Sequence, residues 1–194
     1  MKKFIELLLS SLLILCIYQK TNAQSEPENV FKINPFSLFV GNCTFFYERK
    51  VSDCSTLQLG MNFMPEPIRT FGASFSCFGL TPEWRIYFSQ RLIDVPGGGY
   101  IAPFCRYRCF TMTPPSQFKR NGIETINDEQ NAVGFVLGYQ VITSGDIAFD
   151  FFAGPFYNAN HIALSTGQQI HYDVGYLGTD GMGLRVGAAI GLAL

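Results

Sequence analysis

Charged side chains are scarce in this sequence. Asp, Glu, Lys and Arg make up 15% of the 194 residues, whereas about 25% is usual in soluble domains. The formal net charge is −1 and no basic patch occurs, so nucleic acid is excluded as a predicted partner. Trp is nearly absent, with one residue, but Phe and Tyr are abundant, with 19 and 9 residues. The chain therefore combines many aromatic side chains with few charges.

Long apolar runs are missing outside the N-terminus, which excludes spanning helices in the rest of the chain. The N-terminus has Lys2 and Lys3, an apolar run over 7–18, and small residues that end at Ala23. This order is typical of a secretory signal peptide, and we predict that residues 1–23 are cleaved. A retained membrane anchor is the alternative, but the apolar run is short for one. Residues 24–194 then form a single domain, whose aromatic content favours a β-barrel with aromatic girdles.

Metal and phosphate motifs are absent as well. No Cys-x-x-Cys pair occurs, and His161 and His171 lack His-Glu-x-x-His spacing. Residues 96–99 hold the one glycine run, but no Lys-Ser or Lys-Thr follows, as a phosphate loop requires. We therefore predict no metal site and no cofactor. The cysteines that remain after cleavage are odd in number and are interpreted as small apolar side chains: Cys43, Cys54, Cys77, Cys105 and Cys109.

The C-terminal segment 181–194 carries the clearest structural signal. Large apolar residues such as Leu184 alternate there with Gly, Ala and Arg185. A period of two predicts a strand with one apolar face and one face of small residues. In a soluble sandwich the second face would be polar, whereas Gly and Ala suit the inside of a narrow barrel. We interpret the segment as the closing strand of a transmembrane barrel whose large side chains face lipid.

Seven further segments alternate in the same way, separated by turn signals. With the C-terminal segment they predict strands at about 30–40, 43–51, 56–63, 74–88, 99–111, 131–142, 147–157 and 181–194. The connections at one end are short, at 52–55, 89–98 and 144–146, whereas two at the other end are long, at 113–130 and 158–180. Short inner turns and long outer loops are typical of outer-membrane barrels. The predicted fold is all-β, an eight-stranded antiparallel up-and-down transmembrane β-barrel.

Charged residues gather on the parity of these strands that we assign to the barrel interior. The inward set consists of Glu48, Glu83, Arg85, Arg106, Arg108, Asp150 and Arg185, with Lys32 from the first strand. Because a charge in a low-dielectric interior needs a partner, these residues predict a paired network. An interior of eight strands is just wide enough to be filled by side chains, which favours a structural plug of salt bridges. An ion path or a buried site is the alternative.

Several motifs give the chain a family resemblance. They are INPFSLFVGNCTFFYERKVSD at 33–53, GLTPEWRIYF at 79–88, GGGYIAPFCRYR at 97–108 and GMGLRVGAAIGLAL at 181–194. With them the chain resembles the uncharacterised small outer-membrane β-barrel proteins common in Bacteroidetes. The resemblance implies an outer-membrane location and carries no assigned activity. Barrels of this kind often end in an aromatic residue that the insertion machinery recognises, whereas this chain ends in Leu194.

The two long loops carry the candidate contact residues. Their aromatic and imidazole side chains suit contact with an extracellular or envelope protein, and are Phe118, His161, His171, Tyr172 and Tyr176. The last loop also contains Ser165 and Asp173, which with its two histidines supply the residue types of a Ser-His-acid site. No strand fixes the spacing of these residues, so we predict no catalytic residue. A lipid-modifying enzyme with a site in the last loop is the alternative.

The predicted function is that of an outer-membrane β-barrel protein without an open pore, in a structural or surface-interaction role without catalysis. The predicted partners are outer-membrane lipids, the barrel-insertion machinery and, through the loops, an extracellular or envelope protein. A soluble periplasmic lipocalin-like barrel that binds a lipid is the alternative. In that fold Leu184 and Val186 would line the cavity, while Arg85 and Arg106 would face water.

Overall fold

A computed structural model describes the chain over residues 27–39, 41–64, 68–70, 73–88, 96–113, 125–164 and 181–194, without the side chains of 68–70 and 161–164. The predicted signal peptide, 1–23, lies outside these ranges. The helices and strands of the described residues are, in chain order, β1 (Asn29–Ile33), α2 (Pro35–Phe39), β2 (Cys43–Ser52), β3 (Ser55–Phe63), β4 (Ile68–Thr70), β5 (Ala73–Tyr87), β6 (Gly98–Thr113), β7 (Ile126–Ile142), β8 (Ile147–Leu164) and β9 (Gly181–Ala193).

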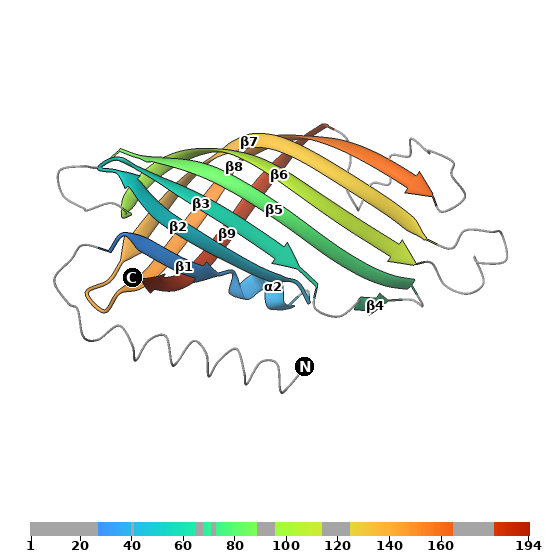
Figure 1. The fold of residues 1–194 in the computed structure, drawn as a ribbon, viewed down its shortest axis with the longest axis horizontal. Coiled ribbons are helices and arrows are strands. Elements are labelled where there is room, and N and C mark those ends of the chain that lie inside the picture. The colour runs from blue at the N-terminus through green and yellow to red at the C-terminus, as the bar shows by residue number, and fades with distance from the viewer. Residues whose placement is uncertain are drawn as a thin grey trace.

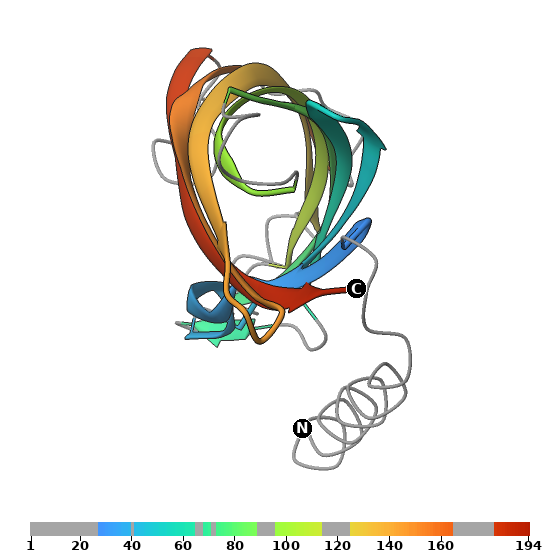
Figure 2. The same ribbon diagram turned by 90° about the vertical axis from the view of Figure 1, so that its left-hand side faces the viewer.

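The long strands form a closed ring, which Figure 2 shows nearly end on. Each pairs antiparallel with its neighbours in sequence, β3 pairs with β5, and β1 pairs with β9 to close the ring. The short strand β4 pairs with β5 alone among the described residues. Alternating aromatic and β-branched residues favour such strands because their side chains pack on a pleated surface. The predicted all-β architecture of eight up-and-down antiparallel strands is confirmed.

One end of the ring holds the C-terminus and the short turns (Figure 1). The backbone N–H of Glu28 donates to the carbonyl of Leu194 at 3.1 Å, and the N–H of Ala193 donates to the carbonyl of Asp146 at 2.8 Å. Asp146 ends the tight turn between β7 and β8 with a φ of 60°. These bonds place the start of β1, the end of β9 and that turn at the same rim, in agreement with the predicted up-and-down order.

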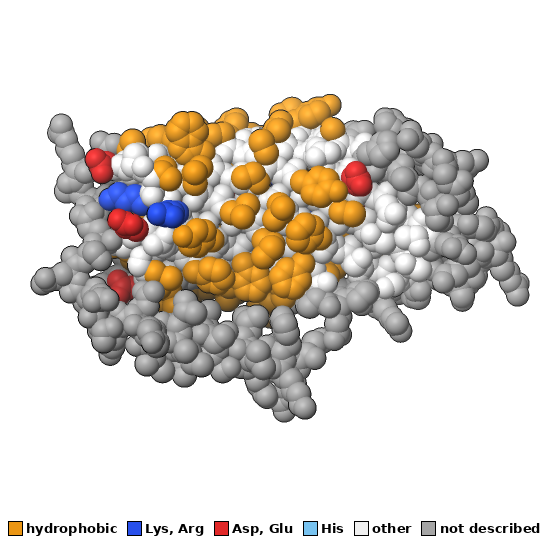
Figure 3. Space-filling model, viewed as in Figure 1, with side chains coloured by type: hydrophobic (Ala, Val, Ile, Leu, Met, Phe, Trp, Pro, Cys, Tyr) orange, Lys and Arg blue, Asp and Glu red, His pale blue; other side chains and the backbone are white. Residues whose placement is uncertain are grey.

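The outer wall of the ring is apolar. Figure 3 shows hydrophobic side chains across the middle of one face, with Lys, Arg, Asp and Glu near the ends. On β9 the exposed fractions of Met182, Leu184 and Val186 are 81%, 71% and 68%. Exposed apolar residues on the other strands include Tyr47, Leu57, Leu59, Trp84, Val133, Phe135, Leu137, Tyr139, Phe151 and Tyr157. The side-chain parity predicted from the sequence is therefore the observed one.

Aromatic and small residues form a packed cluster in the interior. The buried cluster consists of Phe46, Tyr87, Tyr100, Ala102, Phe104, Val136, Phe152 and Ala189. Two glycines make room for its rings. A methyl group at Gly187 would overlap the ring of Phe152, and one at Gly138 would overlap the ring of Tyr100. Gly187 on β9 and Gly138 on β7 therefore accommodate aromatic rings that project from the neighbouring strands β8 and β6.

The first predicted strand, 30–40, is only half correct, because the chain leaves the ring at Asn34 and forms α2. The side-chain Oδ1 of Asn34 accepts hydrogen bonds from the N–H groups of Phe36 and Ser37, at 2.9 and 3.3 Å. Asn as the N-cap and Pro at the first helical position both favour a helix start. Among the described residues, no helix is long and apolar enough to cross a membrane.

Gly41 and Asn42, which separate the predicted strands 30–40 and 43–51, form the C-terminal cap of α2. The N–H of Asn42 donates to the carbonyl of Ser37 and that of Gly41 to the carbonyl of Leu38, at 2.9 and 3.0 Å. Gly41 has a φ of 70°, the left-handed conformation that a helix cap of this type requires. These two residues thus end the helix directly before β2 begins at Cys43.

Strands β7 and β8 are longer than predicted. The sequence pattern predicts long loops at 113–130 and 158–180, but β7 begins at Ile126 and β8 ends at Leu164. Polar residues continue the ladder there, with Gln130 opposite Asn160 and Glu129 opposite His161. Backbone hydrogen bonds hold two strands together whatever their side chains are, so the apolar alternation ended before the strands did.

Candidate functional site

A buried ion cluster fills the ring on the side of the short turns. Lys32 from β1 and Arg85 from β5 lie between Glu48 from β2 and Asp150 from β8, and all four are fully buried or nearly so. The ammonium of Lys32 lies 2.6 Å from Glu48 and 2.9 Å from Asp150. The guanidinium of Arg85 lies 3.4 Å from Glu48 and 2.8 Å from Asp150. Two cations are therefore shared by the same two carboxylates.

Neutral side chains complete the hydrogen bonding of the cluster. The hydroxyls of Thr56 and Tyr87 donate to Oε1 of Glu48 at 2.6 and 2.7 Å, and that of Tyr100 donates to Oδ1 of Asp150 at 2.7 Å. Gln140 accepts from Lys32 at 2.5 Å, and its Nε2 donates to the carbonyl of the buried Pro96 at 2.7 Å. Burial of ions is costly unless such partners are present, and here each carboxylate has several.

A second ion pair borders the cluster. Glu83 on β5 accepts from Arg185 on β9 at 2.5 Å and from Arg85 at 3.4 Å. The Arg185 guanidinium also lies over the rings of Phe104 and Phe152, with its carbon 4.5 and 4.7 Å from their centroids. An arginine between two aromatic faces gains cation–π attraction in addition to its ion pair. Glu83 thus connects the buried cluster to the cavity described next.

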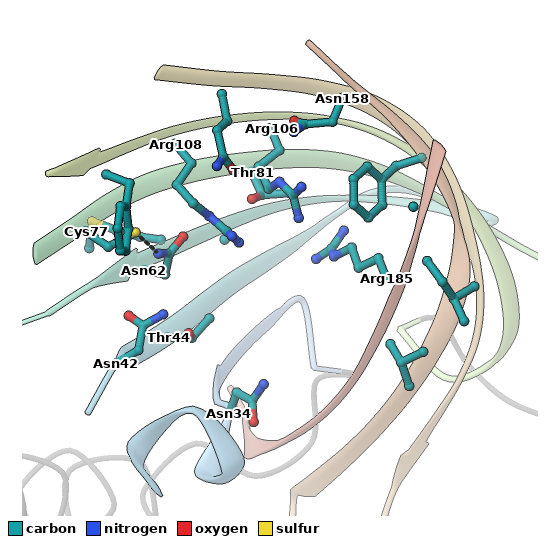
Figure 4. Close-up of a pocket in the computed structure, with 18 of the residues that line it drawn as sticks. Asn34, Asn42, Thr44, Asn62, Cys77, Thr81, Arg106, Arg108, Asn158 and Arg185 are labelled. Carbon is teal, nitrogen blue, oxygen red and sulfur yellow. Dashed lines mark hydrogen bonds between the residues drawn. The ribbon is translucent and has the colours of Figure 1, made fainter. Parts of the chain in front are cut away.

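Beyond Arg185 the interior opens into a cavity of about 530 Å³. Figure 4 shows Arg106, Arg108 and Arg185 with their guanidinium groups directed into it, from β6 and β9. The cavity is further lined by polar side chains: Asn34, Asn42, Thr44, Asn62, Thr81, Gln130 and Asn158. None of its described lining residues is acidic. The cavity is therefore cationic, in contrast to the balanced cluster below it.

Arg106 and Arg108 form no ion pair with any residue in the described ranges. The guanidinium of Arg106 lies 4.5 Å from the centroid of the Phe156 ring. The Nε atoms of both arginines and Nη1 of Arg185 are buried and donate no hydrogen bond within the described part of the chain. Gln130, which also lines the cavity, donates to Asp128 at 2.7 Å. These three buried donors are therefore unsatisfied within the described structure.

The ring has a lateral gap beside this cavity, between β2 and β9. Strand β1 pairs with β9 only from Ile33↔Ile190 to Val30↔Ala193. In the described structure, β9 from 181 to 189 pairs with β8 alone. The helix α2 lies outside the ring (Figure 2) and contacts both β2 and β9, the strands that border the gap. Because Met182, Leu184 and Val186 both line the cavity and are exposed on the outer wall, the cavity reaches the outer surface here.

The structure brings together five of the seven predicted interior charges. Glu48, Glu83, Arg85, Asp150 and Arg185 form one chain of ion pairs with Lys32. Arg106 and Arg108 lie apart from it and line the cavity, so the expectation that Arg106 balances an acid is wrong for the described residues. Sequence reasoning assigned no role to Thr56, Tyr87, Tyr100 or Gln140. Their inward parity was a usable signal, but which charged group each one contacts depends on the register between strands.

The predicted loop contacts mostly lie outside the described residues. This holds for Phe118, His171, Tyr172 and Tyr176, and for Ser165 and Asp173 of the alternative enzymatic site. The backbone of His161 belongs to β8, not to a loop, and pairs with Glu129. In the described part of the chain, no group of three His, Cys, Asp or Glu side chains is placed to hold a metal ion. The five cysteines there form no disulfide.

Comparison of the chain with protein-family models, with curated proteins and with solved structures found no match.

Proposed function

We propose that the protein is an outer-membrane β-barrel without an open pore, which has a structural or surface-interaction role and catalyses no reaction. The observation that carries this proposal is the distribution of side chains around the closed ring. Large apolar residues cover the outer wall, whereas the ions are buried inside. Soluble monomers rarely expose an apolar surface of more than a few hundred Å², and a lipid bilayer is the environment that matches such a wall.

The height of the apolar belt supports the proposal. On β7 the outward apolar residues run from Val133 to Val141, bounded by exposed Asn131 and Thr143. This stretch extends about 27 Å along the strand at the usual rise of about 3.4 Å per residue. At the tilt of about 40° usual in such barrels, it spans about 21 Å of membrane, close to the apolar band of about 25 Å that outer-membrane barrels present.

The closed interior supports the absence of a pore. The four ions of the buried cluster, Lys32 included, have exposed fractions of 0 or 1%. The buried Pro96 lies against Gln140 at the same level. Movement of an ion past this point would require the pairs to separate in a low-dielectric interior, which costs several kcal/mol per ion. We therefore propose the plug rather than the ion path for the interior charges.

The lipocalin-like alternative has less support. It would place Leu184 and Val186 in the interior and Arg85 in water, whereas Leu184 is 71% exposed and Arg85 is fully buried. The proposed partners are outer-membrane lipids, the barrel-insertion machinery and an extracellular or envelope protein. The resemblance to the small outer-membrane barrels of Bacteroidetes and the predicted signal peptide belong to this same proposal.

Two measurements test the proposal. In cell fractionation followed by gel electrophoresis with and without boiling, we expect a band in the outer membrane that migrates differently when unboiled. A soluble periplasmic protein with no change in mobility would overturn the membrane location. In planar lipid bilayers, the refolded protein should give no unitary conductance steps. Stable steps would overturn the closed interior while leaving the barrel itself in place.

A further inference from the structure

The cationic cavity has the chemistry of an anion-binding site. Three guanidinium groups line it, and the only carboxylate bound to any of them within the described structure is that of Glu83, on Arg185. Like charges repel each other, and the repulsion is stronger in a partly buried cavity because the local dielectric is low. Arg106 and Arg108 also have unused buried donors. Guanidinium groups bind carboxylate and phosphate in a bidentate manner, so such a group in the cavity would compensate the charge of the three arginines that line it.

The lateral gap determines which kind of anion fits. The wall of the cavity continues through Leu184 and Val186 onto the apolar outer wall. The helix α2 contacts both strands that border the gap, β2 and β9, and its Leu38 and Phe39 are 52% and 87% exposed. A group held by the arginines can therefore be attached to an alkyl chain that leaves between β2 and β9. A chain in that position would lie against the apolar side chains of β9 and α2 at the opening.

From this geometry we propose that the cavity binds an amphiphile with an anionic phosphate or carboxylate head. Arg106, Arg108 and Arg185 bind the head, and the alkyl chain passes through the gap beside Leu184 into the surrounding membrane. The site rests on the proposed membrane location, since that location supplies the amphiphile and receives its chain. The buried cluster around Lys32 forms the floor of the site and is not itself part of the binding surface.

The test measures binding by isothermal titration calorimetry to the full chain, refolded in a neutral detergent. Dodecyl phosphate is the probe, and inorganic phosphate is the comparison that has the same head without the chain. We expect dodecyl phosphate to bind at least about tenfold more tightly, because the chain adds buried apolar area. Equal affinities would overturn the proposal and identify a simple anion site.

Two matched pairs of variants locate the head and the chain. Arg106→Gln with Arg108→Gln should lower the affinity for dodecyl phosphate at least about tenfold, whereas Arg49→Gln, an exposed arginine of β2, should leave it unchanged. Leu184→Ala should lower the affinity for dodecyl phosphate but not for inorganic phosphate. Its control is Leu137→Ala, which removes the same kind of exposed side chain from β7, a strand away from the gap.

Unchanged affinity in the double arginine variant, or equal effects of Leu184→Ala and Leu137→Ala, would overturn the proposal. Arg106→Lys with Arg108→Lys keeps the charge and should retain more of the affinity than the glutamine pair. The gel mobility of each sample without boiling reports whether the ring has folded. If the proposed membrane location is wrong, the gel mobility and the cell fractionation will show it. If only the proposed binding site is wrong, the titration alone will show it.

Discussion

The most direct test of the buried cluster is Lys32→Met, which removes one charge and nearly preserves the length of the side chain. Lys32 uses all three of its donors, on Glu48, Gln140 and Asp150 at 2.6, 2.5 and 2.9 Å. Without it, two buried carboxylates share Arg85 as their remaining close cation. Loss of one partner from a buried ion pair costs about 3–5 kcal/mol.

The hydrogen bonds that remain place the expected loss near the lower end of this range. The hydroxyls of Thr56, Tyr87 and Tyr100 still donate to the two carboxylates, so we expect about 3 kcal/mol. With a urea m-value of about 2 kcal/mol per M, this loss lowers the urea midpoint by about 1.5 M. The single tryptophan, Trp84, is 53% exposed on the outer wall of β5 and reports unfolding in detergent by its fluorescence.

Two comparisons make the result interpretable. Arg49→Met removes an exposed cation from the neighbouring strand β2 and should shift the midpoint by about 0.5 M or less, because exposed charges contribute about 0–1 kcal/mol. Asp150→Asn added to Lys32→Met restores the charge balance and should recover part of the stability. The reasoning is refuted if Lys32→Met behaves like Arg49→Met, or if the double variant loses the sum of the single effects.

Three further variants test other parts of the structure by the same unfolding assay or by membrane yield. Gly138→Ala places a methyl group in the ring of Tyr100 and should lower the free energy of unfolding by about 1–3 kcal/mol. Its control, Gly99→Ala, meets only ordinary contacts and should be nearly neutral. Equal losses in the two variants would contradict the packing. Leu137→Arg should reduce the outer-membrane yield, because a cation in the middle of the apolar belt costs about 2–4 kcal/mol. Asn131→Arg lies beyond the belt and should cost about 0–1 kcal/mol. Equal yields of the two variants would contradict the proposed position of the belt. Arg106→Ala should cost about 1 kcal/mol, the loss of a ring contact, and a loss above about 3 would indicate a buried ion-pair partner.

Much of the architecture was predictable because one strand period determines the direction of every side chain. Once Leu184 is assigned to the outer face, the alternation also assigns Arg185 to the inside, and the same holds for Trp84 and Arg85 on β5. The predicted inward charges are indeed on the inner parity. What parity does not determine is the position of each charge along the barrel axis. That position depends on the register of nine antiparallel pairings, which places Arg106 beside Phe156 and not beside an acid.

The end of β1 at Ile33 and the start of α2 after Asn34 also have a local signal in the sequence. Asn-Pro followed six residues later by Gly-Asn is a start and a stop for a short helix, but the surrounding alternation favoured a strand over 30–40. The extensions of β7 and β8 gave no such signal, because consecutive polar residues at 127–130 interrupt the apolar alternation of β7. For those stretches only the partner strand reveals the pairing.

The early end of β1 also has a consequence for how the ring assembles. The junction of the first and last strands is held by pairs from Ile33↔Ile190 to Val30↔Ala193, whereas β8 and β9 are paired from Asn158↔Gly181 to Ile147↔Leu192. The shorter junction also joins residues far apart in the chain, so its loop-closure entropy is the largest in the ring. It should form last during assembly and exchange its amide hydrogens first at equilibrium. The part of the wall that completes the fold is then also the part most easily reopened.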